Sequence, residues 1–444
     1  MNPCGPAVAF VSIGCRTNQQ ELFALRGTLL SMGFSIVDLP ESAQFVIVNT
    51  CSVTSLAETK TGRFLRALSR TAPNARILVT GCFAQQHGSA LLEYPGVNWV
   101  IGNAHKHRIP SILTESAKEK KLCFTDVDLA DETSVFWEDC LYGPETSGRT
   151  RFSLKIQEGC DFGCSYCIVP ALRGRSRSAS KLKLVDIFKR SLDMGYKEIV
   201  LTGTHIGQYR DSRDGGGLEE LLTRFLKEKG DYRIRLSSLD PRDLTDTIIS
   251  MAGREKRICD HLHVSVQSLC ADVLRSMKRP HEHLETLLER LRSFRQKYPS
   301  AGLGADFIVG HPGESGAMFE TTLRNAESVG FTYGHVFRFS KRLGTESSLK
   351  GDQITESVKK ARSAALRDLL QNSRNIFLYS QLSIPLRIII EDTEPARGVS
   401  GNYIKVEVRG MPKGKAQKNR WVTARLNGEA ARGYQIAVGL CQNS

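Results

Sequence analysis

Three cysteines lie within eight residues of one another, at Cys160, Cys164 and Cys167. A loop this short can turn all three thiolates toward one metal centre. A structural zinc site usually needs four protein ligands, and no fourth cysteine or histidine lies close by in the sequence. A 4Fe-4S cluster held by three thiolates would instead leave one iron open to a cofactor or substrate. The spacing therefore favours a reactive iron-sulfur cluster, with a zinc or purely structural site as the alternative.

A second set of cysteines is spread along the N-terminal part of the chain, at Cys15, Cys51 and Cys82. Each follows a short apolar run that predicts a strand, and the separations are too large for a local metal loop. In an open parallel sheet, ligands bind beyond the carboxyl ends of the strands, so the three thiols could meet at one edge. Cysteines that simply pack in the core are the alternative. Three equivalent positions favour a second cluster.

The predicted strands and helices that must position these thiols fall into three consecutive regions of the chain. Apolar runs alternate with helix-like stretches up to about Ile101 and again from residue 151 to about 340, which predicts parallel sheets. A polar helix is expected over 354–379, and the β-rich runs after Ser380 predict a small barrel or sandwich. The expected strands are 8–13, 44–48, 76–80 and 98–101, then 152–156, 198–202, 233–236, 261–266, 305–309 and 334–339, and finally 385–390, 403–408 and 421–425.

We therefore expect an α/β protein in three parts. Residues 5–118 should form an open parallel-sheet domain, residues 146–379 a partial (β/α)6 barrel and residues 380–441 a small β-barrel. Residues 119–145 lack a periodic pattern and are predicted to be a linker.

Composition and charge narrow the choice of partners. The 444 residues contain 61 Lys and Arg against 47 Asp and Glu, a net charge of +14 that suits a polyanion such as nucleic acid, although solubility alone is the alternative. Basic residues cluster near the end of the chain, at Lys413, Lys415, Lys418 and Arg420. No apolar run reaches the roughly 18 residues of a spanning helix, and no signal-peptide pattern opens the chain, so we expect a cytoplasmic protein without a membrane partner. Twelve cysteines in that compartment favour metal ligands over disulfides.

Several motifs resemble the radical S-adenosylmethionine methylthiotransferase family: Gly14–Asn18, Asn49–Cys51, Gly81–Gln85 and the loop around the first three cysteines. The resemblance implies that this loop holds a radical cluster whose open iron chelates S-adenosylmethionine, and that the resulting deoxyadenosyl radical abstracts a hydrogen atom. It implies that the N-terminal cysteines hold a second 4Fe-4S cluster that handles the inserted sulfur. It also implies that the last domain is a TRAM-type tRNA-binding barrel.

Within the family, Gly14–Gln19, Cys51–Thr54 and Ser340–Thr345 are most similar to the branch that methylthiolates carbon 2 of threonylcarbamoyl-adenosine beside the anticodon of tRNA. The branch acting on isopentenyl-adenosine is the alternative. A radical enzyme with purely structural N-terminal cysteines and a non-catalytic, zinc-stabilised RNA-binding protein also remain open. The partners implied are the tRNA anticodon stem-loop, a low-potential electron donor such as flavodoxin or ferredoxin, and a sulfur source.

Backbone and small polar groups at strand ends should bind S-adenosylmethionine. The candidates, with the aromatic residue inside the cysteine loop, are Tyr166, Gly203, Ser237, Gln267, Asp306 and Gly310. Leu269–Cys270 replaces the small Gly-Ser of the family, where glycine would allow close approach of the backbone to the cofactor. One of Arg173, Arg175 and Arg177 is expected to reach a tRNA phosphate or the cofactor carboxylate. Histidines two residues apart could bind a metal, but we expect them to be packed or solvated instead. These histidines are His105, His107, His261, His263, His281 and His283.

Overall fold

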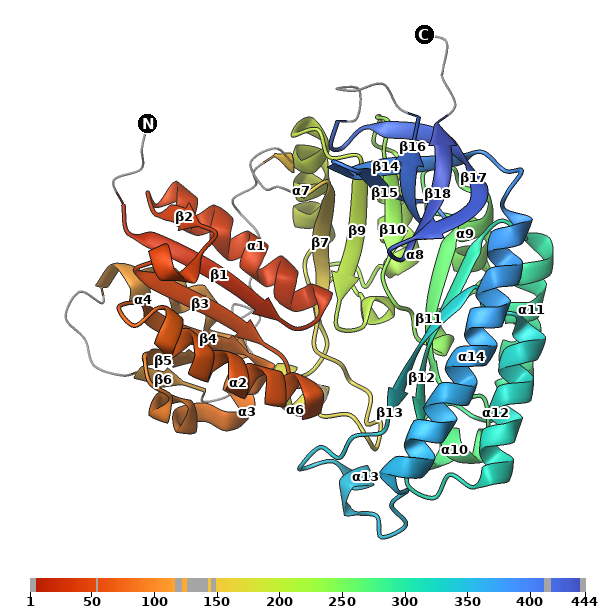
Figure 1. Ribbon diagram of the computed structural model, residues 1–444, viewed down its shortest axis with the longest axis horizontal. Coiled ribbons are helices and arrows are strands. Elements are labelled where there is room, and N and C mark those ends of the chain that lie inside the picture. Colours follow the sequence, from red (N-terminus) through yellow and green to blue (C-terminus); the bar gives the residue numbers. More distant parts are fainter. Residues whose placement is uncertain are drawn as a thin grey trace.

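The structure is a computed structural model that describes residues 5–52, 55–115, 122–125, 143–144, 149–410 and 417–439, with only the backbone of residues 16 and 55–57. It has three parts: an N-terminal sheet, a central half-open barrel and a small C-terminal barrel (Figure 1). Lys413 and Lys415, and most of the predicted linker, lie outside the described residues. None of the described helices is both long enough and apolar enough to cross a membrane.

The N-terminal sheet is parallel throughout, in the order β2-β1-β3-β4-β5-β6. Every residue of the central strand β3 is buried, as expected for a parallel strand covered on both faces. One face packs against α1 and α4 and the other against α2 and α3. The elements are β1 (Ala7–Ile13), α1 (Arg16–Ser31), β2 (Ser35–Val37), β3 (Phe45–Thr50), α2 (Ser55–Thr71), β4 (Arg76–Gly81), α3 (Cys82–His87), β5 (Val97–Ile101), α4 (Ile109–Glu115) and β6 (Leu122–Phe124).

Strand β6 falls inside the region predicted to be a linker. It extends the sheet by pairing with β5. A strand of three residues is too short to show an alternating pattern, which is why the sequence did not reveal it.

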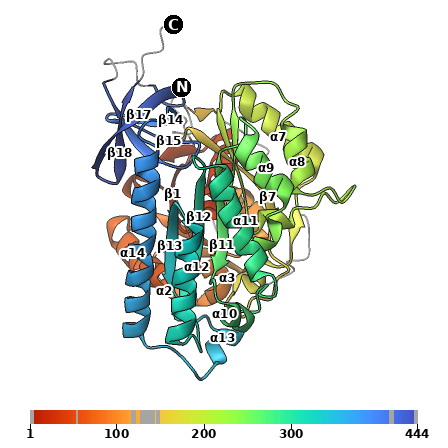
Figure 2. The ribbon, with the colours of Figure 1, turned by 90° about the vertical axis from the view of Figure 1, so that its right-hand side faces the viewer.

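The central domain has six parallel strands, which confirms the partial (β/α)6 barrel. They form two sheets, β10-β9-β7 with a short antiparallel β8, and β11-β12-β13, joined by isolated bridges such as Leu239 to Val264. Helices cover the outside (Figures 1 and 2) and share one core with the strands. The strands are β7 (Arg151–Glu158), β8 (Arg177–Ser178), β9 (Glu198–Gly203), β10 (Arg233–Leu236), β11 (His261–Gln267), β12 (Gly302–Val309) and β13 (Tyr333–Arg338). The helices are α6 (Val169–Arg173), α7 (Lys181–Asp193), α8 (Leu218–Phe225), α9 (Asp246–Arg254), α10 (Ala271–Ser276), α11 (Leu284–Lys297), α12 (Gly316–Val329), α13 (Glu346–Leu349) and α14 (Glu356–Ser380).

The C-terminal domain is a closed barrel in the order β14-β15-β16-β18-β17, as the β-rich runs predicted. Two of its five strands, β15 and β18, were missed because they carry few long apolar residues. The strands are β14 (Leu386–Thr393), β15 (Ala396–Ser400), β16 (Lys405–Arg409), β17 (Trp421–Ala431) and β18 (Tyr434–Gly439).

Two buried arginines of β10 fix this barrel to the central domain. Arg233 donates to the carbonyl oxygen of Val399 (2.8 Å), and Arg235 donates to those of Ser400 (2.8 Å) and Gly401 (2.9 Å). Both guanidinium groups pair with Glu198 of β9, at 2.6 and 2.7 Å. Burial alone would raise the pKa of Glu198, but the two arginines hold it well below its usual range. The carboxylate therefore balances the charges that hold the barrel in place.

Candidate active site

The N-terminal cysteines lie at one edge of the first sheet. Strands β1, β3 and β4 are neighbours, and their last residues are in register: Ile13, Thr50 and Gly81. Cys51 and Cys82 follow directly, and Cys15 follows two residues after β1. A Cβ placed on Gly14 would lie 3.0 Å from the Cβ of Cys51, so the first two segments touch. The topology thus places three cysteines, the first and last of which are 67 residues apart in the chain, at the ends of neighbouring strands.

Polar side chains support this edge. The Cys15 thiol donates to Oδ1 of Asn18 (2.9 Å), and the Asn18 amide donates to Asn49 (2.8 Å) and to the Thr50 carbonyl (2.9 Å). On the other side, Nε of Arg173 lies 3.3 Å from the sulfur of Cys82. Soft thiol donors beside a buried guanidinium fit an iron-sulfur cluster, because the cation offsets part of the thiolate charge.

The other cysteine triad occupies the loop between β7 and α6. The loop begins at Gly159, whose φ of +75° and contact with the Arg175 carbonyl leave no room for a side chain. Backbone bonds from Cys160 to Gly174 (3.1 Å) and from Cys167 to Cys164 (3.0 Å) close it. All three thiols are half-buried, so a cluster there would be shielded while one side stays open.

Two basic residues face these thiols. Nδ1 of His205 lies 3.8 Å from the sulfur of Cys160, and Nη1 of Arg279 lies 3.8 Å from that of Cys164. Burial alone would lower the pKa of His205, but its hydrogen bond to Asp243 raises that pKa to about 9. Burial raises the pKa of the Cys167 thiol to about 12. Three thiolates here need compensating positive charge, which a cluster's iron ions and these two side chains would supply.

A hydrogen-bonded chain supports the loop from behind. The Ser165 hydroxyl accepts from Ser347 (2.8 Å), and the Ser347 hydroxyl lies 2.8 Å from Nε2 of His311. Burial, together with the nearby Lys350 ammonium, lowers the pKa of His311 to about 4. His311 is therefore neutral at physiological pH, where it holds the loop through Ser347.

A cavity of about 340 Å³ opens beside the loop. Three of the predicted cofactor-binding residues line it: Tyr166, Gln267 and Asp306. Gln267 sits at a bulge of β11 with a φ of +63°, a conformation rare for residues other than glycine. Such backbone strain clusters at binding sites, where surrounding contacts must maintain it. The cavity adjoins the cysteine loop directly, because Cys167 is one of its lining residues.

The other three predicted cofactor contacts do not line this cavity. Gly203 lies against the Gln157 carbonyl, Ser237 pairs with the Leu201 carbonyl (3.1 Å), and Gly310 packs on the Lys359 side chain. Their contact with S-adenosylmethionine therefore stays a prediction.

The unusual Leu269–Cys270 pair also lies behind the cavity wall. Both side chains are buried, and Cys270 has a φ of −118°, which needs no glycine. Cys270 packs with Val273 and Met277 against Tyr166. Neither residue of the pair is among those that line the cavity.

Arg342, which the sequence did not single out by itself, connects the cavity to the N-terminal triad. It lines the cavity, donates to the Ser52 carbonyl (3.3 Å) and pairs with Glu58 (2.9 Å), next to Cys51. In the sequence, only its position within the family motif Ser340–Thr345 pointed to a functional role for Arg342. Cys82 also packs with Ile168 and Leu172, which follow the cysteine loop. The cavity therefore borders the cysteine loop directly and is linked to the edge with the N-terminal triad through Arg342.

Arg173 is not the one of the three arginines that could contact tRNA. It is buried and pairs with Glu21 (3.0 Å) and Glu158 (2.6 Å), so it cannot reach a tRNA phosphate. Arg175 is the exposed one of the three, with 90% of its side chain accessible. Arg177 donates to the Arg173 carbonyl (2.9 Å).

The half-open barrel, its three-cysteine loop and the adjoining cavity define the class of protein, a radical S-adenosylmethionine enzyme. The Radical SAM superfamily model matches residues 154–326, and the model of the uncharacterized protein family UPF0004 matches residues 7–102. The structure is similar to the radical S-adenosylmethionine methyltransferase TsrM from Kitasatospora setae, with a TM-score of 0.59 over 78% of this chain and 77% of that one. At 14% identity, this likeness shows the fold alone.

Comparison with the sequences of related proteins identifies the family. The threonylcarbamoyladenosine tRNA methylthiotransferase MtaB of Bacillus subtilis is 33% identical over 91% of this chain and 90% of its own. The tRNA-2-methylthio-N(6)-dimethylallyladenosine synthase of Bartonella tribocorum is 32% identical over 88% and 87%. The chain belongs to the radical S-adenosylmethionine methylthiotransferase family and is an enzyme of that kind. Its cofactors are S-adenosylmethionine and 4Fe-4S clusters, of which two are typical of the family. The non-catalytic zinc protein is thereby set aside.

Proposed function

We propose that this enzyme transfers a methylthio group to carbon 2 of threonylcarbamoyl-adenosine beside the anticodon of tRNA. The observation that carries the proposal is the cavity beside the cysteine loop, whose Arg342 contacts the segment after Cys51, because sulfur insertion needs a radical site and a sulfur-handling site within reach of one substrate atom. Relatives named for both tRNA substrates are about equally similar, so identity alone does not choose between them.

The cavity is lined by apolar as well as charged side chains, and the arginines among the charged ones support the threonylcarbamoyl substrate. Its walls include Asp306, Arg338 and Arg342. A threonylcarbamoyl group carries a carboxylate and several hydrogen-bonding atoms that these charged side chains could bind, whereas an isopentenyl group is apolar and offers them no partner.

In this function, Cys160, Cys164 and Cys167 would hold the radical cluster, and the N-terminal triad would hold the second one. The radical cluster, when bound, supplies the electron that cleaves S-adenosylmethionine. Arg279 would orient the loop, since it bonds Asp240 (2.7 Å) and the Ser265 carbonyl (2.6 Å) as well as facing a thiol.

The C-terminal barrel would bind the RNA stem. Lys418 and Arg420 are exposed at its rim, just before β17, and the chain as a whole is strongly basic. Affinity for tRNA should then fall steeply with salt, because each neutralised phosphate releases counterions. The electron donor and the sulfur source stay predictions, as does a cytoplasmic location.

Anaerobic turnover on two matched anticodon stem-loops tests the substrate. One carries threonylcarbamoyl-adenosine and the other isopentenyl-adenosine, and the nucleoside products are identified by mass spectrometry. We expect the methylthio product from the first RNA. Product from the isopentenyl RNA alone would overturn the proposed substrate, and product from neither RNA would overturn the function.

A further inference from the structure

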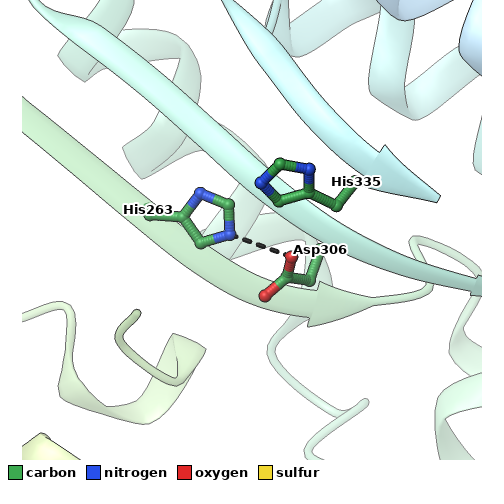
Figure 3. A group of neighbouring side chains, drawn as sticks. All are labelled: His263, Asp306 and His335. Carbon is green, nitrogen blue, oxygen red and sulfur yellow. Dashed lines mark ion pairs between the residues drawn. The ribbon is translucent and has the colours of Figure 1, made fainter. Parts of the chain in front are cut away.

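Three side chains converge inside the barrel, between the cofactor cavity and the C-terminal domain. His263 of β11, Asp306 of β12 and His335 of β13 lie on the same face of one sheet (Figure 3). Asp306 and His335 are direct partners in register, and His263 pairs two residues earlier, with Gly304. Nε2 of His263 lies 3.0 Å from Oδ1 of Asp306, and one ligand atom from each residue lies within 4.8 Å of the others.

A tyrosine fixes the first histidine. The Tyr333 hydroxyl lies 2.7 Å from Nδ1 of His263 and 2.8 Å from Nε2 of His261. Gly304 makes this contact possible, because a Cβ there would overlap the Tyr333 ring and lie 2.5 Å from Nδ1 of His263. When Nδ1 donates its proton to the hydroxyl, the lone pair of Nε2 points toward Asp306. A metal-ligating histidine has this arrangement, with its other nitrogen held by a hydrogen bond.

We propose that His263, Asp306 and His335 bind a divalent transition-metal ion that is separate from both clusters. Two imidazole nitrogens and one carboxylate oxygen are the donors that Zn²⁺, Mn²⁺ and Fe²⁺ share in three-ligand sites with open positions. The sequence favoured packing over metal binding for His263, because only the register of three strands brings the third ligand, His335, beside it.

The coordination positions of the ion that the protein leaves open would face the cofactor cavity. Asp306 lines the cofactor cavity together with Gln267 and Phe337, and His335 is exposed. An ion here would take an oxygen atom of the substrate as a further ligand. Resting on the proposed function, the inference names that oxygen: the carboxylate of the threonylcarbamoyl group, which an isopentenyl group lacks.

Zinc binding to the reconstituted enzyme tests the site. The protein with both clusters filled is dialysed against Zn²⁺, and zinc and iron are quantified in the same sample, so that zinc in unfilled cysteine sites is recognised by low iron. We expect about one zinc ion per chain that is missing from His335→Ala and from Asp306→Asn. His283→Ala removes an exposed histidine of the same domain and should keep the ion.

The hydroxyl of Tyr333 provides a finer test. Tyr333→Phe should retain the ion with affinity weakened by about ten-fold, the size of effect seen when a residue that holds a ligand is removed. Equal zinc content in the wild type, His335→Ala and Asp306→Asn, at full iron, would overturn the metal site and leave a hydrogen-bonded polar cluster.

RNA binding then tests the substrate oxygen separately from turnover. Zinc-loaded wild type should bind the threonylcarbamoyl stem-loop more tightly than the unmodified one by about ten-fold, and His335→Ala should lose this preference. An unchanged preference in the variant would overturn the substrate contact. Zinc binding without methylthiolation would refute the proposed function alone, and methylthiolation without zinc binding would refute the metal site alone.

Discussion

The two cysteine triads are built in opposite ways. One occupies eight consecutive residues and is shaped by a glycine turn and two backbone bonds. The other exists only after three strands have paired in register, because its thiols come from separate strand ends. A local loop can hold its ligands close together before the sheet is complete, whereas the edge site depends on the whole N-terminal fold. Perturbing the sheet should therefore affect one triad and spare the other.

Removing a thiol from the loop gives the largest expected effect. Cys164→Ala should abolish methylthiolation, while iron falls from about eight to about four per chain because the edge triad is intact. Anaerobic iron and sulfide analysis with nucleoside mass spectrometry measures both. Iron falling from about four to none would show that the N-terminal cysteines are structural.

Gly81→Ala should damage the edge triad selectively. Gly81 has a φ of +94°, and a Cβ there would overlap the Thr50 carbonyl that stands beside Cys51. We expect about half of the iron to be lost, with cleavage of S-adenosylmethionine to deoxyadenosine retained. Gly33→Ala is the matched control, since its φ of +87° is similar but no atom lies within 4 Å. Equal losses in the two variants would mean that backbone strain, not the crowded edge, is responsible.

Arg173 belongs to the helix that follows the cysteine loop and lies beside Cys82 of the other triad, so its removal should weaken the packing between the two domains. Arg173→Met leaves the buried carboxylates of Glu21 and Glu158 short of a partner, although Lys106 and Lys155 still pair with them. Breaking such a buried network should lower the free energy of unfolding by about 3 kcal/mol, measured by denaturant titration. Exposed Arg175→Met should change it by less than about 0.5 kcal/mol. Similar values for the two variants would contradict the buried network.

The stabilisation that His311 gives to the cysteine loop should decrease at acidic pH. His311 has a folded pKa of about 4, below its unfolded value, so the unfolded chain binds more protons between those limits. The stabilisation is complete above about pH 6.5 and declines as the pH falls toward about 4. Between about pH 7.5 and about pH 5.5, the wild type should lose about 1 kcal/mol more unfolding free energy than His311→Gln. Parallel pH profiles of the two proteins would contradict this.

The comparison also shows what could be learned from the sequence. The loop triad was visible from spacing, and the edge triad from strand ends, because parallel topology fixes where strand ends lie. The order of the three domains followed from the alternating patterns. Strand β6 was too short to detect, and neither Arg342 nor His335 could be placed without the register of strands distant in sequence. Gly203, Ser237 and Gly310 lie outside the lining of the cavity, and their contact with the cofactor stays a prediction.

The docking of the C-terminal barrel has a mechanical consequence. Besides the buried arginine contacts, the ring of Tyr403 in the barrel packs against two rings of the central domain. Its centroid lies 4.8 Å from that of His261 and 5.4 Å from that of Tyr333. These contacts hold the barrel directly against the central domain, so the distance between the barrel and the reaction cavity should vary little. In the proposed function, the distance from the barrel to the cavity would select the nucleotide that reacts. A stem-loop bound at the barrel would place in the cavity the nucleotide at that distance along the RNA, and any other nucleotide would reach it only if the RNA bends.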